Sequence, residues 1–278
     1  MTPRLGVALG SGGARGIVHI SYIEAIEELG LVPSIIAGTS MGALLGAGWA
    51  SGMRGAELRE YVTQVVTPRE LAGRLWLSGN ASFREFGLNW QIDTATIVAS
   101  YLPDTVPKTF AELKVPLKAI ATDYFRGEQV VFSSGPLLAA VAASLAIPGF
   151  FKPVRIDDGV YIDGGATNPL PADQARQAAD VVVAIDVNGK ISEPPAGNID
   201  PGMFDVGFGA MQIMTRSLTH GVLHTARPEV YVQAPVSGFR VLEFWRSREI
   251  LEQGDRQKDD FKRHLSAAME KATRAPSA

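Results

Sequence analysis

The chain contains no cysteine among its 278 residues, which excludes disulfide bonds, thiolate metal sites and a cysteine nucleophile. It has no run of basic residues, and lysine plus arginine (26) is slightly outnumbered by aspartate plus glutamate (29), so nothing favours nucleic-acid binding. The apolar stretch near the N-terminus is too short for a signal peptide. These absences, with a hydrophobic content of 46%, favour a cytoplasmic globular protein with a sizeable core.

Charge is also absent from residue 31 to residue 53, a stretch long enough to suggest a membrane span. Pro33 and five glycines within it disfavour a continuous helix, and there is no second candidate span. A buried strand followed by a buried helix explains the stretch better.

That stretch contains the sequence Gly-Thr-Ser-Met-Gly at 38–42, after a short apolar run and before a helix-favouring one. Strand, sharp turn and helix are the context of a nucleophile elbow, in which a strained serine projects its hydroxyl from the turn. Gly38 and Gly42 lack a Cβ, so the strand and the helix can approach each other closely. We therefore predict that Ser40 is a nucleophile, although this short motif also occurs in ordinary loops.

A glycine-rich turn, Gly-Ser-Gly-Gly-Ala-Arg-Gly at 10–16, lies between an apolar run at 5–9 and a helical pattern at 17–29. Such a turn presents backbone N–H groups to an anion. A dinucleotide site would require glycine where Arg15 stands, and the Gly-Lys-Ser/Thr of a mononucleotide loop is absent. The remaining candidate is the oxyanion that forms when a nucleophile attacks an ester carbonyl.

The rest of the chain alternates strand-like and helical segments, with no repeat and no linker. The run at 181–187 is apolar and β-branched until Asp186, which indicates a parallel strand covered by helices on both faces. A helix over 204–223 carries an apolar stripe at 204, 208, 211, 214 and 218, which we expect to face the core rather than a lipid surface. Aromatic residues at 76, 83, 86 and 90 predict a satellite core, or else a substrate cleft or lid.

A serine nucleophile needs a base to accept its proton. His220 or His224 could complete a Ser-acid-His triad of the α/β-hydrolase type, but that fold places its elbow after several strands and here only one precedes it. None of the four histidines lies in a motif. The alternative base is Asp163, which ends a strand-like run and is followed by Gly164 and Gly165, where another backbone could approach closely. Partial burial would raise its pKa toward that of a useful base.

Together these residues resemble the patatin-like phospholipase family, in particular bacterial members related to the catalytic domain of neuropathy target esterase. Four stretches carry the resemblance, and they occur in the order that the family shows. They are Ser-Gly-Gly-Ala-Arg-Gly at 11–16, Gly-Thr-Ser-Met-Gly at 38–42, the segment 143–154 that begins Ala-Ser-Leu-Ala-Ile-Pro, and Asp-Gly-Gly at 163–165 followed by Asn-Pro-Leu-Pro at 168–171. One departure is Ser11, which stands where the family's loop often has its first glycine; a loop that acts through backbone N–H groups should tolerate it.

The resemblance implies a three-layer α/β/α fold with a mainly parallel sheet and a Ser-Asp dyad without histidine. It also implies hydrolysis of acyl esters, usually phospholipids or lysophospholipids, without metal or cofactor. In this mechanism Asp163 accepts the proton as Ser40 attacks, and the N–H groups of Gly12, Gly13 and Ala14 bind the oxyanion. The motif-supporting residues are Arg15, which would position the loop, contact a lipid phosphate or form an ion pair, and the glycines Gly16, Gly38, Gly42, Gly164 and Gly165.

Two rival functions use the same residues. An acyltransferase would deliver the acyl group from Ser40 to an acceptor other than water, and a non-catalytic module would only bind lipid. We expect a single domain over residues 5–272, a flexible tail over 273–278, and peripheral contact with lipid implied by the substrate class. Head group, acyl-chain length and oligomeric state do not follow from the sequence.

Overall fold

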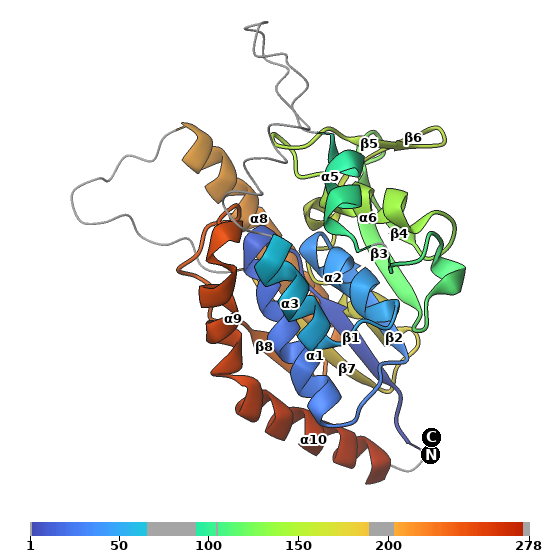
Figure 1. The fold of residues 1–278 in the computed structure, drawn as a ribbon, viewed down its shortest axis with the longest axis vertical. Coiled ribbons are helices and arrows are strands. Elements are labelled where there is room, and N and C mark those ends of the chain that lie inside the picture. The colour runs from blue at the N-terminus through green and yellow to red at the C-terminus, as the bar shows by residue number, and fades with distance from the viewer. Residues whose placement is uncertain (1, 66–92, 104, 189–202, 275–278) are drawn as a thin grey trace, which may run out of the picture.

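The computed structural model of this chain describes residues 2–65, 93–103, 105–188 and 203–274. Within these residues, eight strands form one sheet (Figure 1). The strands are β1 (Leu5–Leu9), β2 (Ile35–Thr39), β3 (Leu117–Asp123), β4 (Glu128–Phe132), β5 (Val154–Ile156), β6 (Gly159–Asp163), β7 (Val181–Asp186) and β8 (Val230–Gln233). The helices are α1 (His19–Glu28), α2 (Met41–Ala50), α3 (Gly55–Val65), α5 (Thr94–Tyr101), α6 (Leu137–Leu145), α7 (Ala172–Arg176), α8 (Met203–Ala226), α9 (Ser247–Asp255) and α10 (Lys258–Arg274), with short 3-10 helices η1 (Gly13–Val18), η2 (Phe110–Glu112), η3 (Gly164–Ala166) and η4 (Phe244–Arg246).

The strand order is β5-β6-β3-β2-β1-β7-β8, and β4 pairs with β3 off this path. The pairs that join β3, β2, β1, β7 and β8 are parallel, whereas β4, β5 and β6 pair antiparallel. Parallel strands end at a common edge of the sheet, so the segments after β1, β2 and β3 emerge close together. The candidate motifs follow β1 and β2 directly.

Helices cover both faces of the sheet, as the continuous apolar strands predict (Figure 1). Alternate residues of β7 belong to different cores: Val183 belongs to the core that includes residues of α1, α2, α6, α9 and α10, and Val182 to the core that includes residues of α7 and α8. The face of the sheet that α7 covers is lined by small side chains, which let that helix lie close to the strands. The structure therefore has the three layers, α/β/α, that the sequence predicts.

The apolar stretch from 31 to 53 forms β2 and α2, both buried, as predicted. In the described part of the chain, no helix combines the length and the apolar character needed to cross a bilayer. The predicted strands and helices around the motifs are confirmed within two residues at most ends, except that the helix expected from residue 17 begins as η1 at Gly13.

The prediction that the apolar stripe of α8 faces the core is wrong for two of its three described side chains, since only Met211 is half-buried. Met214 is 59% exposed and Leu218 is also exposed, while Thr215 and Thr219 are buried. The physical reason is local: each threonine hydroxyl donates to the carbonyl oxygen four residues earlier, so it enters the core without an unsatisfied polar group. Small side chains also suit the close packing on this face of the sheet.

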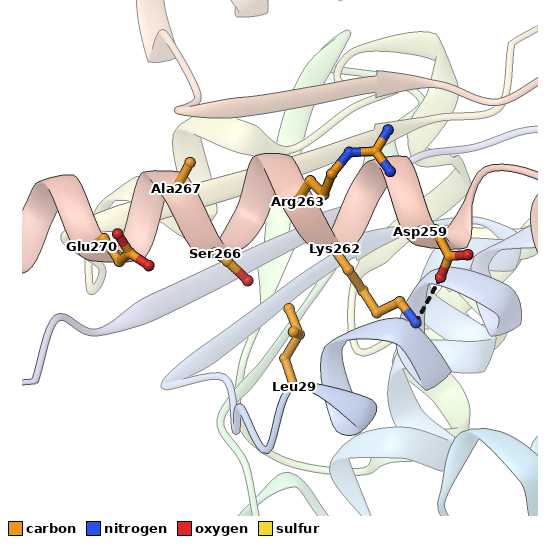
Figure 2. Close-up of a pocket in the computed structure, with 7 residues that line it drawn as sticks. All are labelled: Leu29, Asp259, Lys262, Arg263, Ser266, Ala267 and Glu270. Carbon is orange, nitrogen blue, oxygen red and sulfur yellow. Dashed lines mark ion pairs between the residues drawn. The ribbon is translucent and has the colours of Figure 1, made fainter.

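The C-terminal helix α10 lies across the end of α1 on one face of the sheet (Figure 2). Lys262 forms ion pairs with Glu28 and Asp259, beside an open hollow. This hollow contains Leu29, before β2 begins, and so lies at the opposite edge of the sheet from the motifs.

α10 extends to Arg274, so two of the six residues expected in the tail are helical. The other four, and the aromatic residues predicted as a satellite core, lie outside the described residues.

Candidate active site

Strand β3 brings Ser40 and Asp163 to the same place. β2 pairs with β3 as far as Ile120, and β6 pairs with β3 from Ala121 onward. Since β4 occupies the other edge of β3 along this region, β2 and β6 must share one edge. The last residue of β2, Thr39, is level with Ile120, and Asp163 is level with the next residue. The chain therefore leaves β2 at Ser40, next to the point where β6 ends.

Ser40 occupies a sharp turn between β2 and α2. Its backbone has φ 56° and ψ −123°, a conformation that costs a non-glycine residue about 1–3 kcal/mol. The close approach that the sequence predicts is present: a Cβ on Gly42 would lie 2.1 Å from the Leu9 carbonyl oxygen, and one on Gly38 would lie 2.5 Å from the Gly42 oxygen. The serine is 2% exposed. This is the geometry of a nucleophile elbow.

The end of α6 holds the backbones of both candidate residues. The Ser40 N–H donates to Ser144 Oγ (2.9 Å), and that hydroxyl donates to the Ile120 carbonyl oxygen (2.5 Å). The Asp163 N–H donates to the Ala146 carbonyl oxygen (2.9 Å). Because both bonds come from one helix end, Ser144 and Ala146 set the spacing between Ser40 and Asp163.

Burial and hydrogen bonds act in opposite directions on the Asp163 carboxyl group, which is 7% exposed. Burial raises its pKa to about 6, while the neighbouring Ser40 hydroxyl and the hydrogen bond from the Gly165 N–H (2.7 Å) lower it. A carboxylate with this pKa is a better base near neutral pH than an exposed aspartate. Gly164 permits the tight turn, because a Cβ there would meet the Ile120 carbonyl oxygen.

The glycine-rich turn lies beside the other two segments. A Cβ on Gly16 would meet Met41, the residue after the serine. Within the described residues, the N–H groups of Gly12 and Gly13 have no acceptor. The Ala14 N–H differs from the expectation, since it donates to the Val241 carbonyl oxygen (2.7 Å). Two of the three expected oxyanion donors are therefore available.

Arg15 does not point into solvent, where a lipid phosphate could reach it, because its side chain is almost completely buried. Burial lowers the pKa of its guanidinium, and the charge of Asp186 raises it. In the part of the chain that is described, no carboxylate lies within ion-pair distance of this side chain. Of the roles weighed for Arg15, positioning of the loop fits this burial.

The four histidines differ in burial and in hydrogen bonding. His220 and His224 are exposed on α8, and His264 is exposed on α10. His19 is buried and its Nε2 hydrogen-bonds to the Gly10 carbonyl oxygen, while burial lowers its pKa to about 4. In the described structure, no histidine hydrogen-bonds to Ser40 or Asp163.

Residues 7–176 match the family model of patatin-like phospholipase. This match covers more than half of the chain and includes the glycine-rich turn, the elbow and the Asp-Gly-Gly segment. The chain belongs to the patatin-like phospholipase family. Membership of this family supports lipid ester hydrolysis in general.

The relatives of this patatin-like chain include NTE family proteins and a lysophospholipase. An uncharacterized NTE family protein of Mycobacterium tuberculosis is 37% identical over 206 residues, which is 73% of this chain and 54% of the relative. Lysophospholipase nte1 of Aspergillus fumigatus is 30% identical over 190 residues, 66% of this chain and 12% of that protein. The chain thus spans about half the length of the mycobacterial relatives. The crystal structure of VipD from Legionella pneumophila superposes with a TM-score of 0.52 at 14% identity, covering 96% of this chain and 67% of that one, which shows a shared fold.

Two residues of this patatin-like site had no predicted role. Ser144 lies in the quoted segment 143–154, and the signal that could have identified it is a single hydroxyl in an otherwise apolar helix. Val241 lies beyond the residues that match the family, and it acts through its backbone carbonyl, which carries no sequence signal.

Proposed function

We propose that this chain hydrolyses the carboxylic esters of phospholipids or lysophospholipids, using Ser40 and Asp163 as a catalytic dyad. The observation that carries the proposal is the position of Ser40, in a sharp turn after β2, next to the end of β6, where the buried carboxyl group of Asp163 has a pKa raised to about 6. We assign the activity to one domain over residues 5–272, because Val241 contacts the glycine-rich turn from outside the family match.

In the proposed reaction, Ser40 Oγ attacks the ester carbonyl carbon and Asp163 accepts the hydroxyl proton. The carbonyl oxygen becomes an oxyanion that the Gly12 and Gly13 N–H groups stabilise. The carbon–oxygen bond to the leaving alcohol then breaks, and Asp163 returns the proton to that alcohol. Water attacks the acyl-serine ester with Asp163 again as base, which releases the fatty acid and restores Ser40.

The direct test combines covalent labelling with turnover. We expect a fluorophosphonate to modify the purified chain once, with the adduct on the peptide that contains Ser40 by mass spectrometry. The same preparation should release p-nitrophenol from a short-chain ester and fatty acid from lysophosphatidylcholine. A folded chain that takes no label and releases neither product would be a non-catalytic lipid-binding module, which contradicts the proposal.

An acyltransferase remains the second candidate, because the dyad forms the same acyl-serine in both reactions. Adding glycerol or a lysophospholipid to the assay with a labelled ester separates the two. Hydrolysis predicts labelled free fatty acid at an unchanged rate. Appearance of the label in the acceptor, with a matching fall in free acid, would instead assign transfer.

The pH dependence of the reaction should reflect Asp163. Only its ionised form can accept the serine proton, so kcat/KM for a soluble ester is expected to rise with pH and level off above about 6, with about one tenth of the plateau at pH 5. A pH series on the wild type and on the His220→Ala/His224→Ala variant measures this. If removing these histidines shifts the profile, the base is not Asp163.

A further inference from the structure

Two aromatic side chains project from the edge of the sheet that carries the candidate active site. They are Tyr124 and Phe125, which are 58% and 79% exposed and lie in the turn between β3 and β4. Their rings contact each other edge to face, with centroids 5.2 Å apart. We define residues 123–128 as the aromatic turn. Single exposed apolar side chains are common, but two adjacent large ones at the tip of a turn indicate a contact surface.

The sheet register places the aromatic turn beyond the active site. Ala121 is level with Asp163, and the Tyr124 N–H continues the pairing by donating to the Val160 carbonyl oxygen (2.8 Å). Tyr124 is therefore three residues past the level of Asp163, about 10 Å along the strand axis. The turn lies at the edge where a bulky ester would approach Ser40.

The backbone of the aromatic turn is built by hydrogen bonds that need no aromatic residue. Asp123 Oδ1 accepts the N–H groups of Phe125 and Arg126, each at 3.0 Å, and Gly127 has φ 67°. The Gly127 N–H donates to the Asp123 carbonyl oxygen (2.9 Å). Polar residues at 124 and 125 would keep all these bonds, so the turn itself does not explain the exposed rings.

The chemistry of the tip fits the surface of a phospholipid layer. Tyrosine and phenylalanine place apolar rings at the boundary between head groups and acyl chains, and the exposed Arg126 beside them can stay among the head groups. Glu128 at the end of the turn and the net charge of −3 give no attraction to an anionic surface. We propose that the aromatic turn docks the chain on zwitterionic phospholipid membranes, an inference that rests on the proposed lipid substrate.

The test uses Tyr124→Ser/Phe125→Ser, with Val32→Ser as the matched control. Val32 is 76% exposed but precedes β2, at the opposite edge of the sheet. We expect the double variant to partition onto phosphatidylcholine vesicles about tenfold more weakly than the wild type in sedimentation, because the two rings lose their apolar contact. The ratio of vesicle-lipid hydrolysis to soluble-ester hydrolysis should fall by a similar factor. Val32→Ser should match the wild type in both measurements.

Each outcome bears on one proposal. Vesicle binding by the double variant equal to that of the wild type, equal losses in Val32→Ser, or no vesicle binding by the wild type would overturn the docking inference. If high salt abolishes vesicle binding, the contact is electrostatic, and the docking inference is overturned as well. A chain that binds vesicles through the aromatic turn but never cleaves the soluble ester would leave the docking inference standing and refute the hydrolase.

Discussion

Ser40→Ala should lower kcat for a soluble ester by about a millionfold, to near the uncatalysed background, because no other group can form the acyl intermediate. Asp163→Asn should lower kcat/KM by about a thousandfold, since asparagine cannot accept the hydroxyl proton. The measurement is p-nitrophenol release by the purified variants, with fluorophosphonate labelling as a second readout of serine reactivity.

His220→Ala/His224→Ala is the control for the dyad and should retain wild-type activity. Stability supplies a second control for Asp163→Asn. The folded state raises the pKa of Asp163, so it binds the proton more tightly than the unfolded state, and the resulting stability is lost as pH rises through about 6. Asparagine mimics the protonated acid, so the variant should be more stable than the wild type at pH 8. An active Asp163→Asn chain with an inactive histidine variant would contradict the dyad.

Gly42→Ala should destabilise the fold by about 3 kcal/mol, at the upper end of overpacking effects. The added Cβ would lie 2.1 Å from the Leu9 carbonyl oxygen and 2.9 Å from Leu9 Cβ, and neither the central strand nor the start of α2 can move freely. Urea unfolding at constant m value measures the change. Ester hydrolysis should fall as well, because Ser40 adjoins the displaced helix start.

Gly221→Ala is the matched comparison, since it makes the same change within α8 at a position where a Cβ would meet nothing within 4 Å. There the better helix propensity of alanine should stabilise the chain by up to about 1 kcal/mol. If Gly42→Ala lowers the free energy of unfolding and Gly221→Ala raises it, the close approach of β1 and α2 is the cause of the loss at Gly42. Equal effects would show that Gly42 has no special packing role.

The sequence predicted the elements around the site well because their signals are local. An apolar run followed by Gly-x-Ser-x-Gly specifies the strand, turn and helix around Ser40, and the β-branched run of β7 specifies a strand buried on both faces. The position of Asp163 relative to Ser40 has a weaker signal: the local sequence makes Asp163 one candidate base beside the histidines, and the family resemblance favours it. It depends on which edge of β3 the strand β6 occupies, a long-range choice that no local pattern records.

Predictions that depended on long-range packing were less successful. The stripe of α8 was assigned to the core by its apolar residues, yet Thr215 and Thr219 take the inward face because their hydroxyls bond within the helix. The Ala14 N–H was expected to face the oxyanion, but it meets the carbonyl of Val241, more than two hundred residues away in sequence. Backbone carbonyls are present at every residue, so sequence cannot indicate which one will be used.

The bond between Ala14 and Val241 has a consequence for the order in which the protein becomes active during synthesis. Ser40, Asp163 and the glycine-rich turn all leave the ribosome before Val241 does. A nascent chain that already carries both proposed catalytic residues therefore still lacks the carbonyl that anchors the turn. Under the proposed mechanism, the loop that binds the oxyanion is therefore the last part of the site to be anchored during synthesis.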